Sequence, residues 1–68
     1  MRAEQVLRAL GRDGWYIAWQ GPHTVLRHPT KPGRVEVPRH RGTTLKLGAL
    51  ASILRQAGLT TDDFRRLL

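Results

Sequence analysis

Apolar residues recur along the chain with two different periods, and the change of period divides it into elements. In residues 3–10 they fall at i, i+3, i+4 and i+7, which predicts one face of an amphipathic helix. A second helix is predicted over residues 47–57, because these residues contain one apolar stripe of Leu47, Leu50, Ile53, Leu54 and Ala57. Gly58 follows at a position typical of a helix end. Residues 60–63 resemble an N-cap with an acidic first turn, so we expect a short third helix carrying Phe64.

Between the two long helices the apolar residues alternate, as they do in half-buried strands. Residues 15–20 are rich in aromatic and β-branched side chains and form the first predicted strand. Residues 24–28 form the second, and the proline- and glycine-containing segment 29–33 is a turn. The third strand is predicted over residues 34–38, where Pro38 either closes the strand or lies at a sheet edge.

This order of elements predicts an α+β fold, α-β-β-β-α followed by a short C-terminal helix. Two helices are expected to pack on one face of a three-stranded antiparallel sheet. A chain of 68 residues is expected to be one domain, residues 1–68, with a small core. Strict alternation places Trp15, Ile17 and Trp19 on one face of the first strand. Trp15 is predicted in the core, whereas core packing and base stacking both stay open for Trp19.

The positive charge is concentrated in the middle of the sequence. The chain has a formal net charge of +7, and six of its basic residues lie between Gly21 and Lys46 with Glu36 as the only acidic residue there. Such a basic field favours a polyanion, most simply a nucleic acid, although a solvated charged face is the simpler alternative. The candidate phosphate contacts, taken as a group, are Arg27, Lys31, Arg39, Arg41 and Lys46.

The composition also excludes several classes of protein. Without cysteine the chain forms neither a disulfide framework nor a thiolate zinc site. Its five carboxylates are scattered apart from the Asp62–Asp63 pair, so we predict no metal site and no cofactor. There is no leader of signal-peptide form and no apolar run near the roughly 18 residues of a membrane span. We therefore expect a soluble cytoplasmic protein without membrane contact.

All three histidines lie within or beside the predicted second and third strands. Imidazole acts as a base or an acid near neutral pH, which suits proton transfer in RNA cleavage. A rigid Gly21-Pro22 turn would hold His23 away from the sheet, where a phosphate can reach it. His28 ends the second strand and His40 follows the third. For both, a packing or hydrogen-bonding role competes with a role as a second acid or an RNA contact.

Several short motifs run through most of the chain. They are Gly14-Trp15, Gly21-Pro22-His23, His28-Pro29, Val37-Pro38-x-His40 and the run Leu47-Gly48-x-Leu50-x-x-Ile53-Leu54-x-x-Ala57-Gly58-Leu59. Together they resemble the HicA-type toxins, small ribonucleases of bacterial toxin–antitoxin pairs. The resemblance implies a fold similar to a double-stranded-RNA-binding domain, cleavage of messenger RNA, a catalytic histidine at His23, and neutralisation by a HicB-type antitoxin that covers the active site.

Three functions follow from these observations. The first is a toxin that acts as a metal-independent endoribonuclease, with His23 as general acid/base and nearby cations stabilising the charge on the phosphorane. The second is a family member that has lost activity and mainly binds its antitoxin, in line with Pro22 at a position where members usually have serine or glycine. The third is a non-catalytic RNA-binding module that reads the A-form shape.

Overall fold

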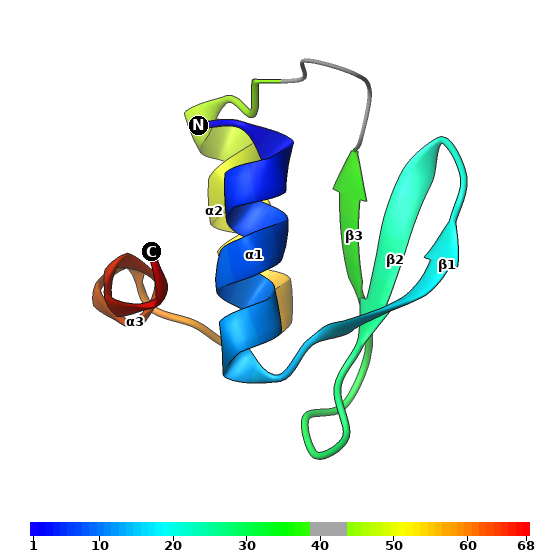
Figure 1. Cartoon of the computed structure of the whole chain (residues 1–68). Helices are drawn as coiled ribbons and strands as arrows, with labels where there is room; N and C mark the ends of the chain where they lie inside the picture. The colour runs from blue at the N-terminus through cyan, green and yellow to red at the C-terminus, as the bar shows by residue number, and fades with distance from the viewer. Residues whose placement is uncertain (39–43) are drawn as a thin grey trace.

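The computed structural model describes residues 1–38 and 44–68, and in them the predicted elements follow one another in the predicted order (Figure 1). The α+β class is therefore confirmed, with boundaries that differ from the predicted ones by a few residues. The elements are α1 (Ala3–Asp13), β1 (Tyr16–Gln20), β2 (His23–Arg27), β3 (Val35–Pro38), α2 (Leu47–Ala57) and α3 (Thr61–Leu67).

The three strands form an antiparallel sheet in the order β1-β2-β3, and α1 and α2 lie on the same side of it (Figure 1). On the face toward the helices, β2 buries Thr24 and Leu26, and β3 buries Val35 and Val37, as the alternation predicts. Residues between these positions point to the opposite face, which we call the outer face of the sheet. Pro38 ends β3, an edge strand, where its missing N–H removes no bond between strands.

α1 and α2 cover the sheet with apolar stripes close to those predicted, although in α1 Ala9 is buried and Leu7 is only partly buried. The buried members are Ala3, Val6, Ala9 and Leu10 of α1, Ile53, Leu54 and Ala57 of α2, and Phe64 of α3. The stripe prediction is wrong at Leu47, which is 85% exposed. The reason is that residues 46–48 are all exposed, so the first turn of α2 extends beyond the core. Among residues 1–38 and 44–68, no helix has the length and apolarity needed to cross a membrane.

The first strand departs from strict alternation at one position. Ile17 lies opposite Leu26, whereas Trp19 lies opposite Val25, so Ala18 is an extra residue that makes a β-bulge. Residues that lie opposite each other in an antiparallel pair point to the same face of the sheet. One extra residue in β1 therefore reverses the alternation of the side chains that follow it. Ile17 therefore faces the helices and Trp19 faces outward. The prediction that both tryptophans share a face with Ile17 is wrong for Trp19, while Trp15 is buried as predicted.

The helix ends follow their sequence signals. Gly14 and Gly58 end α1 and α2 with φ of 109° and 67°, in the left-handed region that favours glycine. Thr60 is the N-cap of α3: its Oγ1 accepts from the Asp63 N–H at 3.0 Å, and its N–H donates to the Asp63 carboxylate at 3.1 Å. This capping box confirms the third helix expected from the acidic first turn.

Candidate active site

His23 is the first residue of β2, directly after the Gly21-Pro22 turn, and it is exposed. The sequence predicted it in the turn, but it pairs with Pro38 of β3 and so belongs to the sheet. Its side chain points to the outer face, like those of Val25 and Arg27. The β1–β2 turn, the end of β3 and the start of α2 lie at the same end of the molecule (Figure 1). His23 thus stands on a fixed backbone at the end where α2 begins.

A shallow depression of about 190 Å³ lies beside His23. Its walls are His23, Glu36 and Pro38 from the sheet and Ala49, Ser52, Ile53 and Gln56 from α2. The four α2 residues fall at i, i+3, i+4 and i+7, so one face of the helix forms a wall. Gln56 also accepts a hydrogen bond from the backbone N–H of Glu36 at 3.1 Å, which ties α2 to the edge of β3. This contact fixes the spacing between His23 and the helix.

The first turn of α2 brings positive charge to the same depression. The first N–H groups of an α-helix have no partner within the helix, and they give this end a partial positive charge. The N-cap is Lys46, whose ammonium group cannot accept a hydrogen bond from the N–H groups of the first turn. The first turn also contains no acidic residue. Ala49 in this turn lines the depression that also contains His23. His23 and the first turn of α2, a helix end that suits anions, therefore border the same small depression.

Arg27 lies at the other end of β2, on the same outer face as His23. Arg27 is four residue steps along the antiparallel strand from His23, a distance of about 13 Å between Cα atoms. The Arg27 side chain is exposed, and its Nη1 donates to the backbone carbonyl of Gly33 at 3.3 Å. Nearby, Arg34 pairs with Glu36 at 3.3 Å, so the acidic residue in the basic middle of the chain has a cationic partner.

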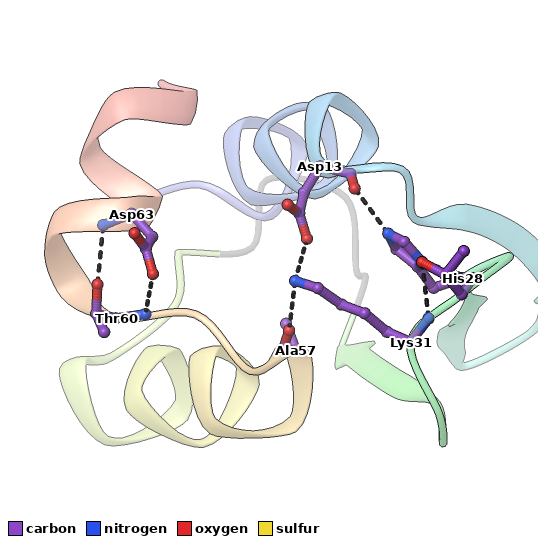
Figure 2. A network of polar contacts seen from close by, with 7 residues as sticks. Asp13, His28, Lys31, Ala57, Thr60 and Asp63 are labelled. Carbon is purple, nitrogen blue, oxygen red and sulfur yellow. Dashed lines mark hydrogen bonds and ion pairs between the residues drawn. The ribbon is translucent and has the colours of Figure 1, made fainter.

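His28, by contrast, uses both ring nitrogens inside the protein (Figure 2). Its Nδ1 accepts from the backbone N–H groups of Thr30 and Lys31 at 3.1 and 3.0 Å. The proton therefore lies on Nε2, which donates to the backbone carbonyl of Asp13 at 2.7 Å. The ring also meets Trp15 edge-to-face, with centroids 5.1 Å apart. This histidine joins the β2–β3 turn to the end of α1.

Lys31 makes a second connection in the same region (Figure 2). Its Nζ lies 2.5 Å from the Asp13 carboxylate and donates to the Ala57 carbonyl at 3.1 Å. A cation at this carbonyl also complements the negative end of the α2 dipole. Both Lys31 and His28 were candidate RNA contacts from the sequence. Their polar atoms are bonded within the fold, which favours structural roles for both.

The remaining candidates divide into exposed and undescribed residues. Arg27 and Lys46 are exposed and accessible to a ligand. Arg39, His40 and Arg41 lie outside the described residues, so their predicted roles stay predictions. The sequence reasoning missed the α2 wall of the depression, although the sequence shows its first turn, Leu47-Gly48-Ala49, with Lys46 before it and no acidic residue.

A larger hollow of about 410 Å³ lies between α2 and α3. Its walls are mostly apolar, with Leu50, Leu54 and Phe64 among them, and they include Arg65 but no histidine, aspartate or glutamate side chain. These are the side chains that most often perform acid–base chemistry. In the described part of the chain no three metal-ligating residues cluster. The depression beside His23 is therefore the better candidate for chemistry.

The fold and the site define a small α+β protein with an exposed histidine beside the first turn of a helix. The sequence model of the family described as "HicA toxin of bacterial toxin-antitoxin" matches residues 3–59 of the chain. The chain therefore belongs to the HicA family of toxins from bacterial toxin–antitoxin systems. The match contains α1, the whole sheet and α2, and it ends before α3. No individual curated protein matches the chain.

Proposed function

We propose that this toxin is a metal-independent endoribonuclease that cleaves messenger RNA, with His23 as its general acid/base. The observation that carries the proposal is the position of His23, exposed on a fixed strand and facing the same depression as the first turn of α2. Membership of a toxin family supports it, because destruction of messenger RNA explains toxicity to the cell that makes the protein.

The chemistry requires little beyond these groups, because RNA carries its own nucleophile. His23 accepts the proton of the ribose 2′-hydroxyl while the 2′-oxygen forms a bond to phosphorus. The bond from phosphorus to the 5′-oxygen then breaks, and a proton from imidazolium or water completes the new 5′-hydroxyl. The products are a 2′,3′-cyclic phosphate and a 5′-hydroxyl end. Proton transfer by a positioned side chain contributes about 10²–10⁴ in rate.

The charge that develops on the phosphorane oxygens needs donors that are already in place. The N–H groups in the first turn of α2, with Lys46 beside them, supply such donors at the depression. Arg27 lies farther along the outer face and holds the backbone of the same RNA strand. Arg39, His40 and Arg41 keep the roles predicted from the sequence, with His40 as a candidate proton donor to the leaving oxygen.

The partner of the toxin is a HicB-type antitoxin, and the toxin acts in the cytoplasm, where messenger RNA is. An antitoxin that covers the end of the molecule with His23 would block access of RNA to the depression. A small acidic protein with a DNA-binding segment, encoded by the adjacent gene, would support this pairing. Co-expression of that protein should abolish cleavage by the purified complex.

The test is to incubate the purified chain and its His23→Ala variant with single-stranded and structured RNA in EDTA. We expect cleavage by the parent, products ending in 2′,3′-cyclic phosphate, and a loss of about 10²–10⁴ in rate for the variant. RNA retention should be similar for both proteins, because His23 is one polar contact among many charges. Retention without cleavage by the parent would contradict the proposal and favour an inactive family member or an RNA-binding module.

A further inference from the structure

The bulge at Ala18 gives the outer face of the sheet two exposed aromatic side chains. Trp19 is 57% exposed and Tyr16 is 54% exposed. Tyr16 lies opposite Arg27 and Trp19 lies opposite Val25, so all four side chains belong to the outer face. Without the bulge, Trp19 would have joined Ile17 on the face toward the helices. Bulges are over-represented next to active sites, where they redirect a side chain.

Trp19 is held in place by its contact with Gly21. A Cβ atom added to Gly21 would lie 2.1 Å from Cη2 and 2.5 Å from Cζ3 of the indole. The six-membered ring thus packs directly on the glycine backbone, which is possible because glycine has no side chain. Gly21 is two residues before His23, so the indole is fixed next to the turn that positions the histidine. A rigid, half-exposed aromatic ring loses little entropy when a ligand stacks on it.

We infer that Trp19, with Tyr16 farther along the strand, is a stacking surface for unpaired bases, and that the substrate is single-stranded RNA. This inference rests on the proposed function, because it specifies the RNA that reaches His23. Bases in a duplex are stacked on one another, whereas unpaired bases stack on aromatic side chains of a protein. The cations on this face suit the phosphates of RNA, since Arg27 lies opposite Tyr16 and Arg34 is exposed nearby.

The experiment uses the full chain with His23→Ala, so that bound RNA stays intact. Trp19→Leu and Trp19→Phe are added separately, and Leu68→Ala is the matched control, because Leu68 is also exposed (52%) but lies at the end of the chain, after α3. The probes are a labelled unstructured RNA of about 12 nucleotides and a labelled RNA hairpin. Melting curves establish that each variant is folded, and affinity is measured over a range of salt concentrations.

We expect Trp19→Leu to weaken binding of the unstructured RNA about 5- to 150-fold, the range known for base–aromatic stacking. Trp19→Phe should lose less affinity for this RNA, and Leu68→Ala should lose none. Binding of the hairpin should change less than twofold for all variants. The slope of affinity against salt should be unchanged in Trp19→Leu, because that slope counts neutralised phosphates.

A second readout covers the case in which Trp19→Leu does not fold. Stacking of a base on Trp19 should quench the tryptophan emission of the parent, and the quenching should be lost in Trp19→Phe, which retains buried Trp15. Equal affinity of Trp19→Leu and the parent for unstructured RNA, or equal losses for hairpin and unstructured RNA, would overturn the inference. Normal RNA binding together with loss of antitoxin binding would also overturn it and assign this face to the protein partner. In each case the dependence of cleavage on His23 would still test the proposed function separately.

Discussion

The two turns of the sheet carry similar residues that differ in exposure and in hydrogen bonding. At each end an aromatic ring packs on a glycine: Trp19 on Gly21 beside the β1–β2 turn, and His28 on Gly14 beside the β2–β3 turn. At the β2–β3 end, His28 is bonded through both ring nitrogens to groups in α1 and the turn. At the β1–β2 end, Trp19 is more than half exposed and His23 faces an open depression.

This difference separates the residues that hold the fold together from those accessible to a substrate. The β2–β3 end joins the last residues of α1, the turn and the end of α2 through His28 and Lys31. Polar groups bonded in this way stabilise the fold but have little capacity left for a ligand. Residues at the β1–β2 end contribute less to stability, so their side chains are available to bind and to react.

A large predicted stability effect distinguishes the two glycines. Gly14→Ala should lower the free energy of unfolding by about 2–3 kcal/mol, because a non-glycine residue is strained at positive φ. In addition, its Cβ would lie 2.6 Å from His28 Nε2. Gly21→Ala should cost much less, since the displaced indole of Trp19 can swing into solvent. Urea unfolding of both variants measures the difference. Equal losses of unfolding free energy would contradict the conclusion that the β2–β3 end contributes more to stability than the β1–β2 end.

Lys31→Met should lower the free energy of unfolding by about 1–3 kcal/mol, because hydrogen bonds from the ammonium group to Asp13 and to the Ala57 carbonyl are lost. Methionine keeps most of the packing of the alkyl chain. Affinity for RNA, measured well below the melting temperature, should not change. A clear loss of RNA affinity without a loss of stability would return Lys31 to the phosphate contacts predicted from the sequence.

Lys46→Ala should weaken RNA binding severalfold and lower the salt slope by about 1, as expected for one phosphate contact. Arg55→Ala is the matched control, because Arg55 is an exposed cation in the last turn of the same helix. Filter binding at several salt concentrations gives both quantities. Identical behaviour of the two variants would argue that net charge, rather than the first turn of α2, attracts the RNA.

The smallest effect that we predict is acid destabilisation through Asp63. The backbone N–H of Thr60, followed by its hydroxyl, lowers the pKa of Asp63 below the ordinary value of 3.8. The carboxylate therefore contributes stability that is present above pH 3.8 and is lost as pH falls through the lower pKa of the folded state. Asp63→Asn should flatten this acid dependence of urea unfolding. Parallel profiles for Asp63→Asn and the parent would contradict the role of the cap.

Most of the fold was predictable because hydrophobic periodicity reports directly on buried faces. The stripe in α1, the alternation in β2 and β3, and the cap at Thr60 each act within a few residues, and each was confirmed. The bulge was not predictable in this way. A single extra residue such as Ala18 leaves no compositional mark, yet it reverses the direction of Trp19.

The candidate site was predictable in part for a similar reason. His23 carries a local motif, but the partners of His28 and Lys31 include backbone carbonyls 15 and 26 residues away in sequence. Every residue has a backbone carbonyl, so the sequence does not show which carbonyl a side chain contacts. Both residues therefore looked like RNA contacts. The turn after His28 offers one sequence signal for its structural role. Between Pro29 and Pro32 lie two backbone N–H groups, and a ring nitrogen can accept hydrogen bonds from both.

The most direct test of the contrast between the two ends compares His23→Ala with His28→Ala in two assays, RNA cleavage per folded molecule and free energy of unfolding. The account predicts that His23→Ala loses about 10²–10⁴ in cleavage rate with stability changed by less than about 0.5 kcal/mol. It predicts that His28→Ala loses about 2–4 kcal/mol of stability while the folded fraction still cleaves RNA. Cleavage that survives in His23→Ala but disappears in folded His28→Ala would contradict it.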